Sequence, residues 1–108
     1  MQQLSSLAKD QQLSSTLKVW LSEQELFLQK LKSGDGEAFR TLYHQYAPAL
    51  FGVISRSVLE EDAASDILEK TFSAIWKNIS EYDETKLRLF TWINQIANRQ
   101  IKDWQLGA

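Results

Sequence analysis

The chain has 108 residues, of which 44% are hydrophobic, 11% aromatic and 24% charged, the composition of one ordinary globular domain. The net charge of -2 argues against a general basic nucleic-acid coat protein, and the absence of Cys excludes disulfides and thiolate metal sites. Four Gly and one Pro are few for the many tight turns of an all-β protein, so the composition favours a helical domain.

The N-terminal part is expected to be a separate extension. Residues 1–12 are rich in Gln and Ser and predict a frayed end. A short leading helix is predicted from apolar residues that share one helical face, namely Leu13, Leu17, Trp20 and Leu21. We therefore expect residues 1–21 to be an extension and residues 22–106 to form the domain.

The next segment has the signals of a helix with a defined start and end. Residues 22–25 have capping-box spacing, and the apolar residues that follow predict a helix to about Lys32. Residues 33–36 break that helix, and Asp35 is well placed to cap the next one by accepting hydrogen bonds from its free N–H groups.

A long helix is expected after Asp35. Its apolar stripe follows helical spacing without a break and consists of Phe39, Leu42, Tyr43, Tyr46, Leu50, Ile54 and Val58. Pro48 lies inside the stripe, and because Pro lacks the N–H and clashes one turn back, we expect a kink or a restart of the helix near residues 45–47.

Two further helices complete the predicted fold. One begins at residues 59–61 and has an apolar face of Ile67, Leu68, Thr71, Phe72, Ile75, Trp76 and Ile79. Residues 80–88 lack a helical period and are predicted to be a loop, and a last helix is expected over about residues 89–104. The predicted fold is an all-α small helical bundle of three principal helices plus shorter N-terminal ones.

Charge is unevenly distributed along the second half of the chain. Residues 60–85 carry eight acids and two Lys, whereas residues 86–108 carry four cations and one acid. Two faces with different partners would explain the split, and so would an unevenly charged solvated surface.

The segment 82–104 has residue types suited to unpaired nucleic acid, because it combines aromatic rings, cations and amides. Aromatic rings stack on bases, Lys and Arg hold phosphates, and amides read base edges. Trp92, Gln95 and Arg99 share one helical face, and Asn94 and Asn98 form a neighbouring row. The same spacing also fits core tryptophans and solvated amides.

No catalytic arrangement is found in the sequence. No phosphate-binding glycine motif occurs, and His44 has no obvious nucleophile partner. Asp62, Asp66 and Glu69 could face a divalent ion, but an acidic, solvated helix start explains them as well. We expect no enzyme activity, no cofactor, no small-molecule substrate and no membrane span, and a cytoplasmic location, since the N-terminus also lacks signal-peptide features.

Four motifs in order resemble region 2 of bacterial sigma factors, especially the small extracytoplasmic-function (ECF) type. They are GDGEAF at 34–39, LYHQYAPAL at 42–50, ASDILEKTFSAIW at 64–76, and FTWI at 90–93 followed by Ile96-Ala97 and Asp103. The resemblance covers about three-quarters of the chain, from Glu25 to Trp104. Small sigma factors normally continue into a helix-turn-helix domain that reads the -35 element, so we expect this chain to be an excised N-terminal part.

The resemblance implies two interfaces. The third helix would bind the clamp coiled coil of the β′ subunit of core RNA polymerase, and the predicted contact residues are Asp66, Leu68, Glu69, Phe72 and Ser73, of which Phe72 equally fits the core. The last part would capture the non-template single strand of the promoter -10 element, and the predicted DNA-binding residues are Tyr82, Lys86, Arg88, Thr91, Trp92, Asn94, Gln95, Asn98, Arg99 and Lys102. The family pattern often has Arg-Asn where this chain has Asn98-Arg99, a difference of about 100° around a helix.

A second interpretation remains open at this point. The chain could be a sigma-like interaction module that binds RNA polymerase or an anti-sigma factor without opening promoter DNA. Such a module would keep the third helix but bind -10 single strands no better than random sequence.

Overall fold

The computed structural model describes residue 19 and residues 23–107. The predicted frayed end, the leading helix and Ser22 of the predicted capping box lie outside the described residues. Within the described residues every regular element is a helix, which confirms the all-α prediction.

The first continuous stretch of the described chain is a helical segment, residues 23–32, whose end is fixed by backbone hydrogen bonds. Asp35 N donates to Lys30 O at 3.0 Å and Gly34 N donates to Leu31 O at 3.1 Å, which is the pattern of a Schellman motif. Gly34 has a φ of 84°, a left-handed conformation that costs glycine little. Leu31, which is 1% exposed, anchors this last turn in the core.

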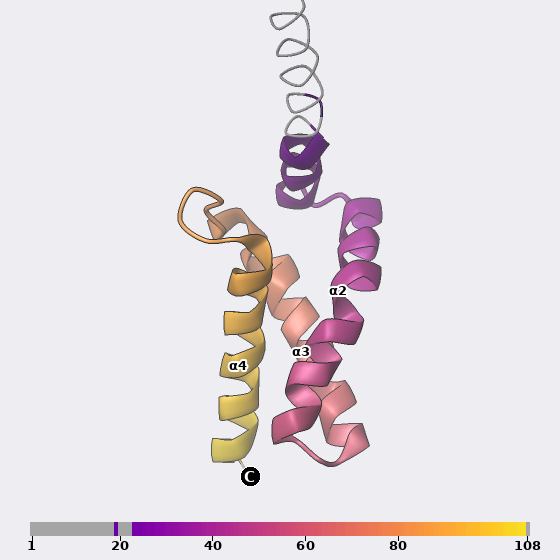
Figure 1. Ribbon diagram of the computed structural model, residues 1–108, viewed down its shortest axis with the longest axis vertical. Helices are drawn as coiled ribbons and strands as arrows, with labels where there is room; N and C mark the ends of the chain where they lie inside the picture. The colour runs from indigo at the N-terminus through magenta and orange to yellow at the C-terminus, as the bar shows by residue number, and fades with distance from the viewer. Residues whose placement is uncertain (1–18, 20–22, 108) are drawn as a thin grey trace, which may run out of the picture.

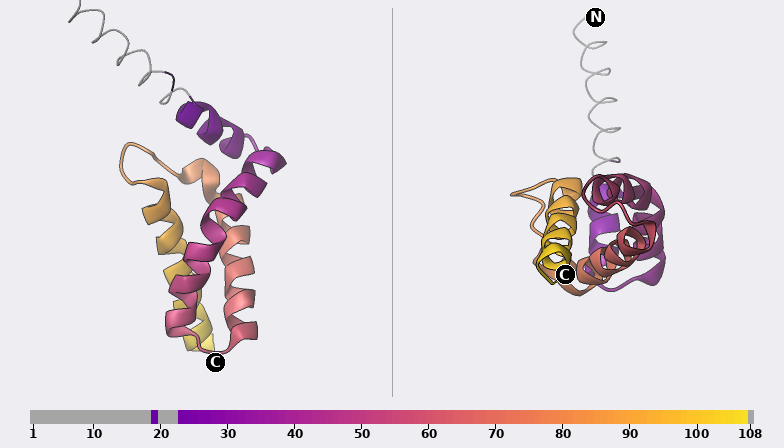
Figure 2. Two further views of the ribbon diagram at one scale, coloured as in Figure 1. Left: turned by 45° about the vertical axis from the view of Figure 1, so that its right-hand side comes forward. Right: turned by 90° about the horizontal axis from the view of Figure 1, so that it is seen from below.

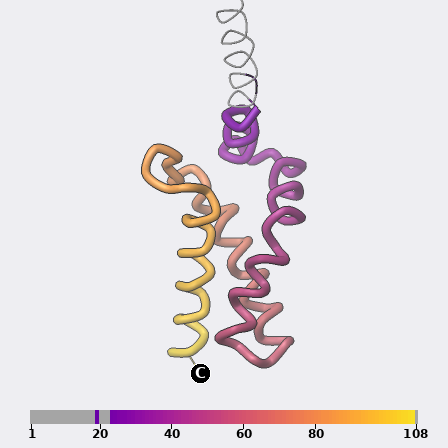
Figure 3. The backbone as a smooth tube through the Cα atoms, viewed as in Figure 1, coloured from indigo at the N-terminus to yellow at the C-terminus, as the bar shows by residue number. Residues whose placement is uncertain are grey.

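Helix α2 spans Gly36–Ser57 and begins where the sequence predicts. The Asp35 side chain accepts a hydrogen bond from Glu37 N at 2.9 Å, so it is the predicted cap. Of the two alternatives expected near residues 45–47, a kink or a restart, the restart does not occur, because the helix continues through Pro48. The tube in Figure 3 changes direction partway along α2, as a proline within a helix leads us to expect.

Helix α3 spans Glu61–Asn78 and is followed by a 3-10 turn, η1, at Ile79–Glu81. Helix α4 spans Leu89–Gly107, three residues longer than predicted. The predicted loop is therefore shortened at its start, and the connection between η1 and α4 is residues 82–88.

The three long helices lie side by side, α3 packing against both of the others (Figure 1). The chain descends through α2, returns through α3 and descends again through α4, so the loop 82–88 and the segment 23–32 lie at the same end (Figures 1 and 2). The core between the helices is aliphatic, and its most buried side chains include Leu42, Leu50, Ile54, Ile67, Ile75 and Ile93. Among the described residues no helix is long and apolar enough to cross a membrane.

From the packing of the core we expect substitutions at two nearby positions of α4 to have very different effects on stability. Ile93 is 0% exposed, so Ile93→Ala removes buried methylenes and leaves a cavity, and we expect it to lower the free energy of unfolding by about 2–5 kcal/mol. Gln95 is exposed on the opposite side of the same helix, and Gln95→Ala should change the free energy of unfolding by less than about 0.5 kcal/mol. Urea unfolding followed by circular dichroism measures both values, and equal effects would contradict the packing described.

Candidate nucleic-acid and protein interfaces

The outer face of α4 gathers most of the predicted DNA-binding residues. Because successive helical residues turn by about 100°, Thr91, Gln95, Asn98 and Lys102 form one row. All four are exposed. Arg88 and Arg99 are exposed beside that row, and Lys86 is exposed in the adjoining loop. The face therefore offers cations, amides and a hydroxyl to solvent, with the aliphatic core behind it.

Asn94 differs from the other amides of α4. It lies at the boundary between the exposed row and the core, and it is only partly exposed. Its Oδ1 is buried and has no hydrogen-bond partner among the described residues. The predicted row of Asn94 and Asn98 is thus split, and only Asn98 presents its amide fully to solvent.

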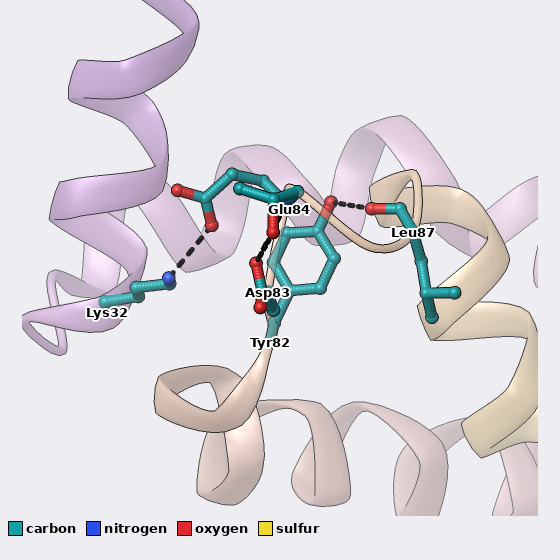
Figure 4. Close-up of polar contacts among 6 residues, drawn as sticks. Lys32, Tyr82, Asp83, Glu84 and Leu87 are labelled. Carbon is teal, nitrogen blue, oxygen red and sulfur yellow. Dashed lines mark hydrogen bonds and ion pairs between the residues drawn. The ribbon is translucent and has the colours of Figure 1, made fainter.

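Tyr82 is the structural centre of the loop rather than a surface residue. It is 4% exposed, and its hydroxyl donates to Leu87 O at 2.7 Å, which joins the start of the loop to its end (Figure 4). Its ring packs against the partly buried Trp92, with ring centroids 5.2 Å apart. The prediction that Tyr82 touches DNA directly does not fit this burial; the ring instead supports Trp92 from the loop side.

The two carboxylates that follow Tyr82 have separate partners. Asp83 Oδ1 accepts from Thr85 Oγ1 at 2.6 Å and from Thr85 N at 2.9 Å, which forms an Asx turn. Hydrogen bonds from the Thr85 hydroxyl and amide lower the pKa of Asp83. Glu84 Oε2 lies 3.1 Å from Lys32 Nζ (Figure 4), and hydrogen bonds from its own amide and from Lys32 lower the pKa of Glu84.

A groove of about 740 Å³ opens beside the loop, between segment 23–32, α2 and the start of α4. Aromatic rings make much of its wall, contributed by Phe27, Tyr46, Tyr82 and Phe90. Tyr46 and Phe90 stack with centroids 5.7 Å apart and an interplanar angle of 28°. Arg88 adds a cation to the lining, so the groove combines flat apolar surfaces with positive charge.

The predicted polymerase-binding residues of α3 fall into two groups. Asp66, Glu69 and Ser73 are exposed on one outer face, and Asp66 pairs with Lys70 at 3.1 Å. Leu68 is partly buried and packs against the core. Phe72 belongs to the core, since it is 4% exposed. Its place as a polymerase contact is therefore corrected: it lies on the helix side that faces α2.

Aromatic packing explains the position of Phe72. Its ring lies 4.7 Å from that of Tyr43 and 6.1 Å from that of Phe39, centroid to centroid. Trp76 completes the cluster, 4.8 Å from Phe39, and remains 40% exposed. Together the four rings join α2 to α3.

The acidic residues of α3 form no metal site. No group of three carboxylate or imidazole side chains in the described part of the chain is arranged to hold a metal ion. Asp62, Asp66 and Glu69 are all exposed at the solvated outer face of the helix. The geometry thus favours the solvated helix start over the divalent-ion site.

Sequence reasoning missed the contact between Lys32 and the loop and the participation of Phe27 and Tyr46 in the groove. Both depend on tertiary packing across more than thirty residues, which no local pattern reports. The Asx turn did have a signal, because an Asp two residues before a Thr in a polar loop is typical of that turn.

Known proteins with similar sequences or folds place the chain in one class. Residues 42–106 match the family Sigma-70 region 2. The ECF RNA polymerase sigma factor SigK of Mycolicibacterium vanbaalenii is 23% identical over 82 residues, covering 76% of this chain and 42% of that protein. SigK of Mycobacterium tuberculosis is 22% identical over 82 residues, covering 76% and 44%.

The fold agrees with a solved structure. An engineered region 2 of sigmaE, determined by NMR in complex with GTAAAA, superposes with a TM-score of 0.69 at 21% identity, covering 76% of this chain and 84% of that one. The family match and the fold agree in defining a Sigma-70 region 2 domain. This chain belongs to the Sigma-70 region 2 family, is distantly related to ECF sigma factors and spans less than half the length of the SigK relatives.

The hydrogen bond of Tyr82 yields a stability prediction. Tyr82→Phe removes the donor to Leu87 O but keeps the ring, so we expect the free energy of unfolding at pH 7 to fall by about 0.5–1.5 kcal/mol. Urea unfolding of both proteins measures the difference.

The same pair of proteins should differ in pH dependence. Burial, reinforced by the nearby Glu84 carboxylate, raises the pKa of Tyr82 above its ordinary value of 10.0. Because a raised pKa favours the protonated form in the folded state, its stabilising contribution is complete below pH 10.0 and is lost as the pH rises toward the folded pKa. The advantage of the parent over Tyr82→Phe should therefore shrink above pH 10.0, and an advantage that grows there would contradict the burial of the hydroxyl.

Proposed function

We propose that this chain binds core RNA polymerase through the outer face of α3 and captures the non-template strand of the promoter -10 element through the loop 82–88 and α4. The observation that carries the proposal is that an aromatic-walled groove and a closed loop lie at one end of a region 2 fold, and that an exposed cationic and amide face runs from there along α4. The sigmaE region 2 complex with GTAAAA supports a strand of this kind as the ligand.

Single-stranded DNA suits the chemistry of this end better than duplex. Opening a duplex costs a few kcal/mol for each extruded base, and contacts made only to the open strand must offset that cost. Aromatic surfaces such as Trp92 and the groove wall can stack on unpaired bases, and Lys86, Arg88, Arg99 and Lys102 can hold the phosphates. The exposed amides Gln95 and Asn98 would then contact base edges.

The α3 face suits a protein partner. Its exposed residues Asp66, Glu69 and Ser73 lie in the acidic part of the chain, which repels phosphates. An acidic surface can steer a partner of opposite charge and fix its orientation. Binding to polymerase would place the domain in the cytoplasm, and an anti-sigma factor could compete for the same face.

Stacking on Trp92 is tested by a pair of tryptophan variants. Trp92→Ala should weaken binding to the preferred single strand, selected from a randomised pool, by about 1–3 kcal/mol, because one stacking surface is lost. Trp104→Ala is the matched control, since Trp104 is also a partly buried ring of α4 but lies near the opposite end. Fluorescence anisotropy gives the affinities and circular dichroism verifies the helices. Equal losses in both variants would count against stacking by Trp92.

Polymerase binding is tested by reversing charge on α3. Asp66→Arg should weaken binding to the isolated β′ clamp coiled coil roughly tenfold or more, because it places a like charge against a complementary surface. The exposed pair with Lys70 contributes little to the fold, so the variant should remain folded. Asp103→Arg, an exposed reversal on α4, should bind normally.

The same experiments separate the two candidate functions. Coiled-coil binding together with a preference among single strands supports the proposal. Coiled-coil binding without any such preference would establish the interaction module in its place. A folded chain that binds neither ligand would refute both.

A further inference from the structure

The helical segment 23–32 precedes the residues matched by the family, yet it contacts the loop that we propose reads the promoter strand. Lys32 Nζ lies 3.1 Å from Glu84 Oε2 and 5.9 Å from the centroid of the Tyr82 ring. Both contacts cross at least fifty residues of sequence, and Figure 4 shows the Lys32 side chain directed from its helix toward the loop.

The base of the Lys32 side chain is held in place. Leu31 anchors the preceding position in the core, and the Schellman motif through Gly34 ends the helix immediately afterwards. Asp35 then begins α2 at once. Lys32 therefore reaches the loop from a fixed point of the domain, and its contact restrains the loop relative to the helices.

The loop has few other links to the rest of the domain. The Asp83–Thr85 turn and the backbone bonds from Lys86 N and Leu87 N to Asp83 O, at 3.1 and 3.3 Å, all lie within residues 83–87. These bonds shape the loop internally but do not fix where it sits. Three side chains link the loop to the rest of the domain: Tyr82 packs on Trp92, Leu87 packs against the core, and Glu84 pairs with Lys32.

The contact with Lys32 also offsets the negative charge of Glu84 in the loop. Glu84 is an anion two residues from Lys86, beside a surface proposed to bind phosphates. Lys32 offsets that charge and holds the carboxylate toward segment 23–32. Position and charge are different effects, and an experiment can separate them because they predict different consequences of removing each partner.

We infer that Lys32 is a positioning residue for promoter recognition: through Glu84 and the ring of Tyr82 it sets the location of the loop 82–88 and so sharpens base discrimination by the DNA-binding end. The inference rests on the proposed function. It assigns a role in sequence preference to a residue that precedes residues 42–106, the part of the chain that matches the family.

The test uses the full chain and a single strand with six randomised positions between constant flanks, whose bound and unbound fractions are sequenced. The variants Lys32→Met and Glu84→Gln remove the two partners and change net charge in opposite directions. Each should reduce the preference for the best over the average sequence roughly two- to fivefold, a range set by the modest strength of partly exposed ion pairs. The double variant should lose no more of this preference than either single variant does, because the two changes break the same contact.

Two further variants complete the design. Lys30 is an exposed cation of the same segment and forms no ion pair among the described residues. Lys30→Met should therefore keep the parent's preference among single strands. Lys32→Arg retains the positive charge and should show the parent's preference among single strands. Hydrogen exchange of the Lys86 and Leu87 amides gives a readout without DNA, and should be faster in Lys32→Met and Glu84→Gln than in Lys30→Met.

Each outcome has a distinct meaning. If the parent prefers particular strands but Lys32→Met matches Lys30→Met in both preference and exchange, the inference is wrong and the proposed function stands. If Lys32→Met lowers and Glu84→Gln raises overall affinity with preference unchanged, Lys32 acts by charge alone and the inference is again overturned. If the parent shows no preference among strands, the proposed function fails and the inference falls with it.

Discussion

The burial of Tyr82 is the interaction on which the DNA-binding end depends. Its ring occupies the space between the loop and Trp92, and its hydroxyl joins residue 82 to the carbonyl of Leu87. A loop of seven residues with many polar side chains would otherwise sample many conformations, and ordering each residue on binding would cost about 1–2 kcal/mol. Because the loop is closed before any strand arrives, that cost is reduced, which is the physical basis of preorganised recognition.

The same burial links recognition to the helical core. Trp92 stands beside Tyr82, and the next residue, Ile93, is fully buried between the helices. The position of Trp92 is therefore fixed by α4 on one side and by the loop on the other. A stacking surface held in this way needs little rearrangement when a base reaches it.

The helices could be predicted from the sequence because their signals are local and repeated. The stripe from Phe39 to Val58 has the helical period, and Asp35 has the side chain and position of a cap, so the start of α2 and its buried face followed directly. The effect of Pro48 was harder to predict, because a proline within a helix either breaks it or bends it according to how strongly the flanking residues are packed. Here buried Ala47 and Leu50 lie on either side, and the helix continues.

The candidate site was less predictable because its side chains lie near boundaries. On α3, a single step separates the buried Phe72 from the exposed Ser73, and helical periodicity assigns such edge positions poorly. Asn94 has the same ambiguity on α4, where its amide lies between the core and the exposed row. The role of Lys32 could not have been found at all, since its partners come from a loop at least fifty residues away and no local pattern brings them together.

The packing of the bundle explains how two interfaces can work on a domain of this size. Helix α3 uses its inner side to contact both α2 and α4, which leaves its acidic outer face free, while α4 keeps its cationic and amide row on a different outer surface. Opposite charge on the two surfaces means that a phosphate backbone is repelled from one and attracted to the other. Along the sequence, the acidic segment 60–85 passes into the basic segment 86–108 within the loop 82–88. There the negative charge of Asp83 and Glu84 is directed into contacts with Thr85 and Lys32. The two carboxylates nearest the DNA-binding end are therefore held in contacts and do not face an approaching phosphate backbone.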